Sequence, residues 1–238
     1  MKERFELKYV IPKHVVPLLV KDMECFVQRD GYVINDDGSY QVNGIYLDTP
    51  NLNAYKDKLA GIFSRKKYRL RWYNGVTDKI NLEIKERTAS RIIKTKMPIA
   101  FTDLKDLVLE NRFKLTSYDP SENLVLTKFR NSYFNNNLKP IVYIQYRRIP
   151  FVSSDGLNTR ITFDYDILAG SADVFERKSK MVDVLGKDNM VLEFKFFDQM
   201  PFWVMNLIRK FGLQDQSYSK YCESVSATHR KGMMGGVW

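Results

Sequence analysis

Residues 67–73 read KYRLRWY, residues 79–87 read KINLEIKER and residues 90–97 read SRIIKTKM. Charged and apolar side chains alternate along these stretches with the period of two that is typical of β-strands. Asn74-Gly75 and the region around Thr88 supply turns between them. This part of the chain is therefore expected to form consecutive antiparallel strands.

Five further stretches are predicted as strands: residues 3–11, 41–48, 141–151, 160–168 and 190–197. Apolar residues at helical spacing predict helices over 12–27, 51–59, 101–113, 120–135, 201–211 and 219–228. The order predicts an α+β fold, in which about eight strands close into an antiparallel β-barrel with peripheral helices and few exposed edges. We expect one domain over 1–230 and a disordered tail over 231–238, which reads KGMMGGVW.

The predicted strands have one charged face and one apolar face. Arg69 and Arg71 share a face opposite Leu70, and Glu193 shares one with Lys195. Two arrangements fit this pattern. If the charged faces meet water, the sheet is half-buried with its core on the apolar side. If the sheet closes with its helices outside, the charged faces line a lumen that would bind a polyanion tightly, because arginine grips phosphate oxygens in pairs.

The positive charge is concentrated in one part of the chain. The 238 residues hold 38 Lys and Arg against 28 Asp and Glu, a net charge of +10. Between Ser64 and Lys96, eleven basic residues face three acidic ones, which accounts for +8 of that charge. Such a cluster indicates a polyanionic partner or, as the simpler alternative, a solvated basic surface.

Several classes of protein are excluded by composition. Two Cys and two His are too few for a disulfide scaffold or a Cys/His zinc site, and neither His14 nor His229 suits a serine-type triad. A metal would be held by carboxylates, which favours Mg²⁺ or Mn²⁺. No stretch approaches the length of a membrane-spanning helix, and the mixed charges of the N-terminus argue against a secretory signal, so a cytoplasmic protein is expected.

A series of short motifs resembles one known family. In order along the chain they are RFELKY at 4–9, YLDTPNL at 46–52, RLRWY at 69–73, LEIKER at 82–87, the Lys94/Lys96 strand, YRRIPF at 146–151, RITFDYDI at 160–167, VLEFKF at 191–196 and SYSKY at 217–221. Together they resemble the VTC domain, the polyphosphate-polymerase domain of the vacuolar transporter chaperone complex. That family belongs to the triphosphate tunnel metalloenzymes, also called the CYTH-like superfamily.

The resemblance implies a closed antiparallel tunnel and a set of site residues. Four arginines would neutralise the reacting phosphates: Arg69, Arg71, Arg148 and Arg160. Further substrate contacts would come from Lys8, Lys85, Lys94, Tyr146, Ser219 and Lys220. Glu193 would bind the divalent metal, Mn²⁺ or Mg²⁺. Glu83 could also ligate the metal, but it more readily serves to neutralise the neighbouring arginines.

Two positions depart from the family pattern. The first strand of the superfamily often reads Glu-x-Glu-x-Lys, and Arg4 stands at the first of these glutamates, which leaves Glu6. This difference favours binding of a phosphate chain over a two-metal hydrolytic site. Ser217 stands where fungal members have a further lysine, so the product end of the tunnel is expected to bind less tightly.

The activity implied is transfer of the γ-phosphoryl of ATP, or another nucleoside triphosphate, to a growing inorganic polyphosphate. Alternatives are a triphosphatase or cyclase-like enzyme on the same tunnel, and a non-catalytic binder of polyphosphate or nucleic acid. Nucleic-acid binding is not expected, because the aromatic residues Tyr68, Trp72 and Phe163 fall on the face opposite the arginines and cannot stack on bases bound there.

Overall fold

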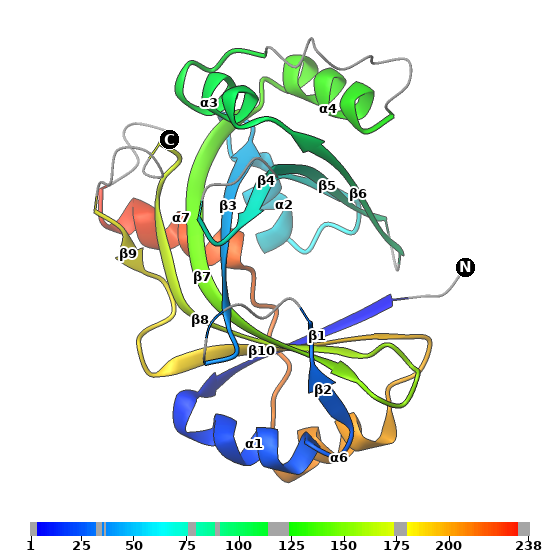
Figure 1. The fold of residues 1–238 in the computed structure, drawn as a ribbon. Helices are drawn as coiled ribbons and strands as arrows, with labels where there is room; N and C mark the ends of the chain where they lie inside the picture. The colour runs from blue at the N-terminus through cyan, green and yellow to red at the C-terminus, as the bar shows by residue number, and fades with distance from the viewer. Residues whose placement is uncertain are drawn as a thin grey trace. The chain divides into compact units, whose positions relative to one another are not determined.

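The computed structural model describes residues 4–31, 35, 37–75, 80–88, 91–113, 124–173 and 180–232 (Figure 1). Its strands are β1 (Arg4–Pro12), β2 (Val27–Arg29), β3 (Tyr40–Asp48), β4 (Arg65–Tyr73), β5 (Ile80–Thr88), β6 (Arg91–Ile99), β7 (Lys139–Ser153), β8 (Arg160–Ser171), β9 (Val182–Asp183) and β10 (Asn189–Phe197). Its helices are η1 (Lys13–Val15, 3₁₀), α1 (Val16–Met23), α2 (Asn53–Leu59), α3 (Phe101–Leu109), α4 (Leu124–Asn135), α6 (Phe202–Lys210) and α7 (Lys220–Arg230). All eight predicted strands and all six predicted helical regions are present, with shifted ends.

The strands form one sheet in the order β1-β10-β8-β7-β3-β4-β5-β6, with β2 paired to β7 and β9 to β8. Within the described residues, no hydrogen-bonded pairing joins the end strands β1 and β6, so a closed barrel is not confirmed. The barrel prediction rested on strand number and alternation, and neither property determines whether the first and last strands pair. The antiparallel sheet with helices is confirmed.

The chain divides into two compact units. The first unit comprises Met1–Gln41, Tyr146–Ile167 and Leu185–Ser219. The second comprises Val42–Gln145, Leu168–Val184 and Lys220–Trp238. The boundaries cut through β3, β7 and β8, so each unit is assembled from three separate stretches of chain. The predicted single domain over 1–230 stays a prediction.

In the first unit, α1 and α6 cover the apolar face of the strands β1, β10 and β8 (Figure 1). Leu19 on α1 and Val204 on α6 are fully buried there, together with Phe194 of β10. The helix predicted over 12–27 is wrong at both ends: η1 precedes α1, and Val27 starts β2, which pairs with β7. The spacing of apolar residues favoured a longer helix, but Val27, its predicted last residue, pairs with β7 instead.

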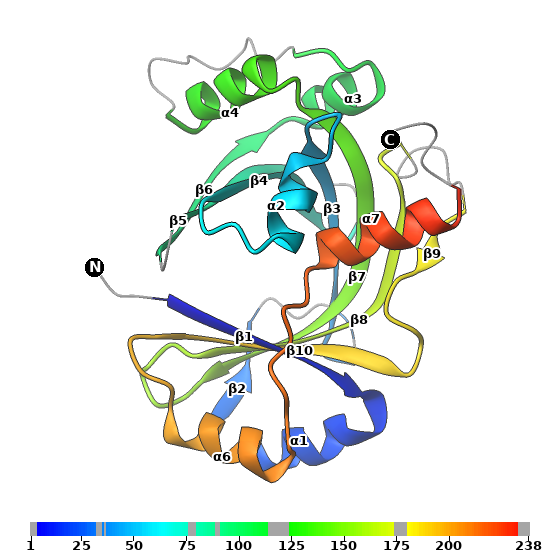
Figure 2. The same cartoon turned by 180° about the vertical axis from the view of Figure 1, so that it is seen from behind.

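In the second unit, α3 and α4 cover the apolar face of β4, β5 and β6, as both views show (Figures 1 and 2). Leu70 of β4, Leu82 of β5 and Phe129 of α4 are fully buried in this core. The predicted start of the helix at Ser121 and most of the predicted tail lie outside the described residues. Among the helices that the structure describes, none is long and apolar enough to cross a membrane.

Candidate functional site

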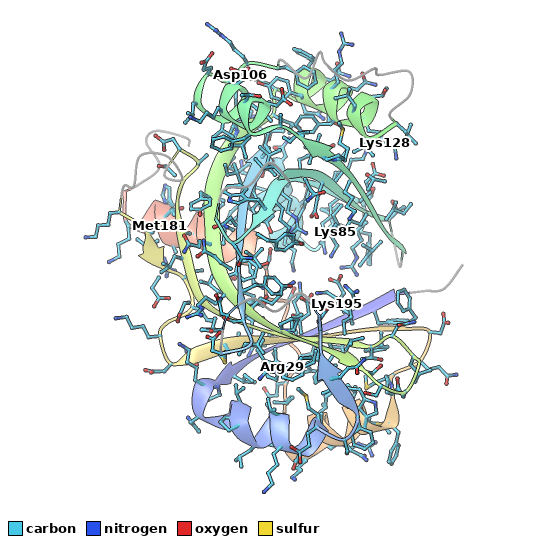
Figure 3. The ribbon with its side chains drawn as sticks, viewed as in Figure 1. Arg29, Lys85, Asp106, Lys128, Met181 and Lys195 are labelled. Atoms are coloured by element: carbon cyan, nitrogen blue, oxygen red, sulfur yellow. The ribbon has the colours of Figure 1, made fainter. Side chains whose placement is uncertain are left out.

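In the second unit, the sheet face that turns away from α3 and α4 is strongly basic. The strand register aligns Tyr46 of β3, Arg69 of β4, Glu83 of β5 and Lys96 of β6 in one row across four strands. Lys85 lies on the same face, one row further along. Figure 3 shows Lys85 on this side of β5. The alternation predicted from the sequence therefore places Arg69, Arg71 and Lys85 on one face, as expected.

Glu83 is the centre of this face. Its carboxylate lies 2.6 Å from Arg69 Nε, 2.7 Å from Lys94 Nζ and 3.8 Å from Arg71 Nη1. Burial alone would raise the pKa of the Glu83 carboxyl, but Arg69, Arg71 and Lys94 outweigh it and lower the pKa to about 2. Glu83 is thus ionised and neutralises the surrounding cations, which is the role that the sequence favoured.

Two further groups of this face have altered acidity. Arg69 Nη1 donates to the Tyr46 hydroxyl at 3.1 Å. Burial opposes ionisation of Tyr46, yet the charges of Arg69 and Arg71 lower its pKa to about 8. Burial and the charge of Arg69 lower the pKa of Lys94 to about 8, although Glu83 favours its charged form. The positive charge of this face therefore overcomes burial at Tyr46 and adds to the effect of burial at Lys94.

The N-terminal end of α7 contacts this basic face. The Tyr221 ring stacks on Tyr46 at 5.3 Å between centroids, and Lys67 Nζ lies 5.6 Å from the Tyr221 ring centroid. Lys220, a predicted substrate contact, is the first residue of α7. Lys67 lies on the same face of β4 as Arg69.

The first unit also carries a polar face, on the side of its sheet away from α1 and α6. There Lys8 of β1 pairs in register with Glu193 of β10, and Glu193 pairs with Thr162 of β8. Arg160 lies opposite Lys195 on the next row and is exposed. Figure 3 shows Lys195 on this side of β10.

Glu193 makes two ion pairs, with Lys195 Nζ at 2.5 Å and with Lys8 Nζ at 3.7 Å. Burial lowers the pKa of the Lys195 ammonium to about 8, with Arg148 adding to the effect and Glu193 opposing it. The carboxylate proposed to bind metal is therefore balanced by two ammonium groups.

Arg148 is held firmly within the first unit. Its Nε and Nη2 donate to the two oxygens of Asp164 at 2.6 and 2.8 Å, and its guanidinium lies 5.4 Å from the Tyr146 ring centroid. Burial would lower the pKa of Arg148, but Asp164 outweighs burial and raises it. Both Arg148 and Asp164 are buried. Ser219, also buried, closes this unit at its C-terminal end.

The predicted site residues thus gather in two groups, one in each unit. Arg69, Arg71 and Lys94 surround Glu83, while Lys8 and Glu193 form an ion pair in the other unit. Three residues that contact predicted site residues were not predicted as part of the site: Tyr46, Asp164 and Lys195. Strand alternation could have identified two of them. Lys195 lies two positions from Glu193, and Asp164 lies four positions from Arg160, so each shares a strand face with a predicted residue. Convergence of all these side chains on one lumen involves both units and stays a prediction.

A metal could be held here by one protein carboxylate. Among the described residues, no three His, Cys, Asp or Glu side chains form a group that could hold a metal ion. Mg²⁺ and Mn²⁺ can bind through one carboxylate and take their other ligands from substrate phosphates and water. Glu193, which pairs with Lys8 and Lys195, stays the residue predicted to hold such a metal, and the metal would supply further positive charge there.

Comparison with known proteins identifies a family and a fold. The family described as the VTC domain has a model that matches residues 3–229. The structure is similar to that of a candidate adenylate cyclase from Bacillus halodurans, with a TM-score of 0.54, 11% sequence identity and coverage of 92% of this chain and 95% of the other. A Hippeastrum protein, described as a candidate adenylyl cyclase with dominant triphosphatase activity, is similar at a TM-score of 0.49 and 13% identity, with coverage of 100% and 99%. At these identities the likeness to the first structure shows the fold alone.

Proposed function

Since the chain belongs to the VTC domain family, we propose that it is a polyphosphate polymerase that uses ATP or another nucleoside triphosphate. The observation that carries this proposal is the convergence of Arg69, Arg71 and Lys94 on one face around a buried carboxylate. Family membership agrees with the motifs found in the sequence.

Repulsion between two polyanions is the main obstacle to this reaction. A terminal oxygen of the polyphosphate attacks the γ-phosphorus of ATP, the bond from that phosphorus to the β,γ-bridging oxygen breaks, and ADP leaves with the electron pair. Arg69 and Arg71 neutralise the charge of the reacting phosphates, and their fixed positions avoid reorganisation during the transfer. Glu83 keeps Arg69 in place through its 2.6 Å ion pair.

The remaining predicted site residues each have a defined part in this proposal. Arg148, oriented by Asp164, and the exposed Arg160 contribute positive charge, while Lys8 is a point contact for phosphate. Glu193 would hold Mn²⁺ or Mg²⁺, and a bound metal would supply further neutralisation of phosphate oxygens. Lys85, Lys220, Tyr146 and Ser219 are further proposed substrate contacts.

Two carboxylates of the site, Glu83 and Asp164, are poor candidates for the general base that water or a ribose hydroxyl would need as nucleophile. Water and hydroxyl groups need a general base, whereas a terminal phosphate is already ionised at neutral pH. Glu83, with a pKa of about 2, is a weak base. Both carboxylate oxygens of Asp164 accept hydrogen bonds from Arg148. These carboxylates neutralise charge and are poorly suited to take a proton.

Product analysis tests the proposal. Purified protein incubated with ATP and Mn²⁺ should yield long phosphate chains on a polyphosphate gel. Free phosphate alone would indicate a triphosphatase, and cyclic nucleotide would indicate a cyclase. Either result would overturn the polymerase proposal.

The Glu193→Gln variant tests the metal assignment in the same assay. Synthesis should fall sharply, because the amide keeps the side-chain shape but loses the charge needed to hold a divalent ion. Circular dichroism would check that the fold persists. Normal synthesis at the same Mn²⁺ concentration would mean that another carboxylate, such as Glu6 or Glu83, binds the metal.

A further inference from the structure

The end of α2 and the loop that joins it to β4 (Figure 2) expose three large apolar side chains. Leu59, Ile62 and Phe63 are 64%, 46% and 75% exposed. Among the large apolar side chains that the structure describes, Phe63 is the most exposed. A single exposed apolar residue is ordinary, but three within five positions form a patch of the kind that marks an interaction site. We call residues 59–63 the apolar loop.

Hydrogen bonds hold the apolar loop in a defined turn. Gly61 has a φ of +69°, a conformation that glycine adopts without strain. The Gly61 amide donates to the Lys58 carbonyl at 3.3 Å, and the Ile62 amide donates to the Asp57 carbonyl at 2.9 Å. This pair of bonds ends a helix in the Schellman motif. Arg65 Nη1 also donates to the Ile62 carbonyl, at 3.1 Å. The exposure of the loop is therefore a property of an ordered turn.

The motif leaves Ile62 without its usual contact inside the turn. In a Schellman motif, the residue that follows the glycine commonly packs against an apolar residue five or six positions earlier. Here these positions hold Asp57 and Lys56, whose side chains are polar. Every residue from 59 to 64 is exposed. The turn thus projects from the second unit with its apolar side chains in water.

The apolar loop is flanked by positive charge. Between Lys56 and Lys67 the chain has five basic residues and one acidic residue, a net charge of +4. Lys56 is exposed and stands three positions before Leu59, so the two side chains share one side of α2. Apolar side chains beside lysines are typical of segments that lie on acidic membranes. The apolar groups enter the boundary between headgroups and acyl chains, and the lysines attract the acidic headgroups.

Two other occupants fit these observations less well. A second copy bound through the same loop would bring two segments of charge +4 together, in a protein whose net charge is +10, and like charges repel. A peptide ligand binds in a groove or along a sheet edge. The apolar loop is neither, since all of its residues are exposed. A broad surface with negative charge is the partner that its shape and charge match.

We propose that the apolar loop and Lys56 dock the protein on a lipid bilayer that contains acidic phospholipids, with Phe63 inserted among the headgroups. The site binds the surface of the bilayer without spanning it. This inference goes beyond the proposed enzymatic function and does not depend on it, because none of these residues is among the proposed substrate contacts.

Sedimentation of the full chain with lipid vesicles tests the proposal. Vesicles of phosphatidylcholine mixed with phosphatidylserine should bind the protein, and vesicles of phosphatidylcholine alone should bind it much more weakly. Phe63→Ser should weaken binding to the acidic vesicles about tenfold, the scale of one large apolar side chain withdrawn from water. Its melting temperature should stay unchanged, because Phe63 is exposed in the folded protein.

Phe202→Ser is the matched control, since Phe202 of α6 in the first unit is the same type of residue and is 70% exposed. It should bind both kinds of vesicle as the unmodified protein does. Lys56→Ala should weaken binding to the acidic vesicles about fivefold at low salt, the scale of one lysine near an acidic surface. Lys21→Ala removes an exposed lysine of α1 and should not weaken it.

Three results would overturn the docking site. If the unmodified protein does not bind acidic vesicles, the loop has a protein partner instead. If Phe63→Ser binds them normally, positive charge alone adsorbs the chain to lipid. If Phe202→Ser is as defective as Phe63→Ser, insertion is not specific to the apolar loop. A dimer in analytical ultracentrifugation that Phe63→Ser dissociates, with vesicle binding unchanged, would make the loop a contact between copies and the proposal wrong.

Discussion

Arg71 and Lys66 lie on the same strand but on opposite faces, and they should respond very differently to substitution. Arg71 is buried, lies 3.8 Å from Glu83 and donates to the Tyr73 hydroxyl at 3.3 Å. Arg71→Lys keeps the charge but loses the planar guanidinium, which can bind two phosphate oxygens at once. Turnover at saturating ATP should therefore fall by a factor that corresponds to about 2–3 kcal/mol of lost transition-state stabilisation.

Lys66→Ala removes a whole charge, but the Lys66 side chain is exposed, so the turnover of this variant should stay close to that of the unmodified protein. Equal losses in Arg71→Lys and Lys66→Ala would mean that the basic face only attracts polyanions in general. The catalytic role of Arg71 would then be wrong.

Glu83 should make stability depend on acid pH. Its pKa is about 2 in the folded protein against an ordinary value of 4.5, so the ionised form stabilises the fold above about pH 4.5. The shift corresponds to about 3 kcal/mol, which is lost as pH falls from 4.5 toward 2. Urea denaturation of the protein and of Glu83→Gln should therefore differ by about 3 kcal/mol at pH 7 and by much less near pH 2.

A constant difference between pH 7 and pH 2 would contradict this assignment. It would mean that Glu83 stabilises the unit through packing and hydrogen bonds that do not require its charge.

Side-chain partners were the hardest feature to predict from sequence. Alternation was enough to place Arg69 and Arg71 together, because a strand has only two faces. It could not show that Glu83, which faces Lys96 in register, pairs with Lys94 at 2.7 Å. Such diagonal contacts depend on the rotamers of long side chains, which no local pattern fixes.

At the scale of elements, one buried carboxylate joins α2 to α7. Asp48, at the end of β3, accepts from the backbone amides of Ala54 and Tyr55 at 2.9 and 3.1 Å and from the Tyr221 hydroxyl at 2.6 Å. Tyr221→Phe leaves this buried carboxylate without one donor. The free energy of unfolding should fall by about 1–3 kcal/mol in urea denaturation.

Tyr55→Phe is the control for that prediction, since its hydroxyl contacts Ser226 at 3.0 Å in a partly buried position. It should cost about 1 kcal/mol or less. If both variants lose the same stability, the Asp48 contact is not what attaches α7.

Elements with strong local periodicity were predicted well, and short ones were missed. The strands β4, β5 and β6 each lie within two residues of their predicted ends. β2 and β9 contain three and two residues, too few for a period to be recognised. Both exist because they pair with β7 and β8, which are distant in sequence.

For the whole molecule, the sequence predicts that basic residues of both units act on one substrate. Calorimetry should then find one tripolyphosphate bound per chain. Lys8→Ala in the first unit and Lys85→Ala in the second should each weaken that single event and leave its stoichiometry unchanged. Two binding events, each lost in only one variant, would contradict a shared substrate.

Closure of the sheet is the part of the fold that the sequence could not supply. Alternation and turns predicted the number of strands and their polar faces. Whether the first and last strands pair depends on the whole chain, and the residue pattern within one strand does not predict it. The division into two units has the same origin, since each unit draws on three distant stretches.

The contact between Tyr46 and Arg69 gives the protein an optical indicator of its own. Tyr46 ionises near pH 8, whereas burial raises the pKa of Tyr9 to about 12 and raises that of Tyr143 as well. A phenolate absorbs at longer near-ultraviolet wavelengths than a phenol, so at pH 8 the tyrosinate band should arise largely from Tyr46. A polyanion bound at Arg69 would offset the guanidinium charge, raise the pKa of Tyr46 and bleach that band. Adding polyphosphate at pH 8 should therefore lower the tyrosinate absorbance without any label. In Tyr46→Phe the same addition should leave the near-ultraviolet absorbance unchanged.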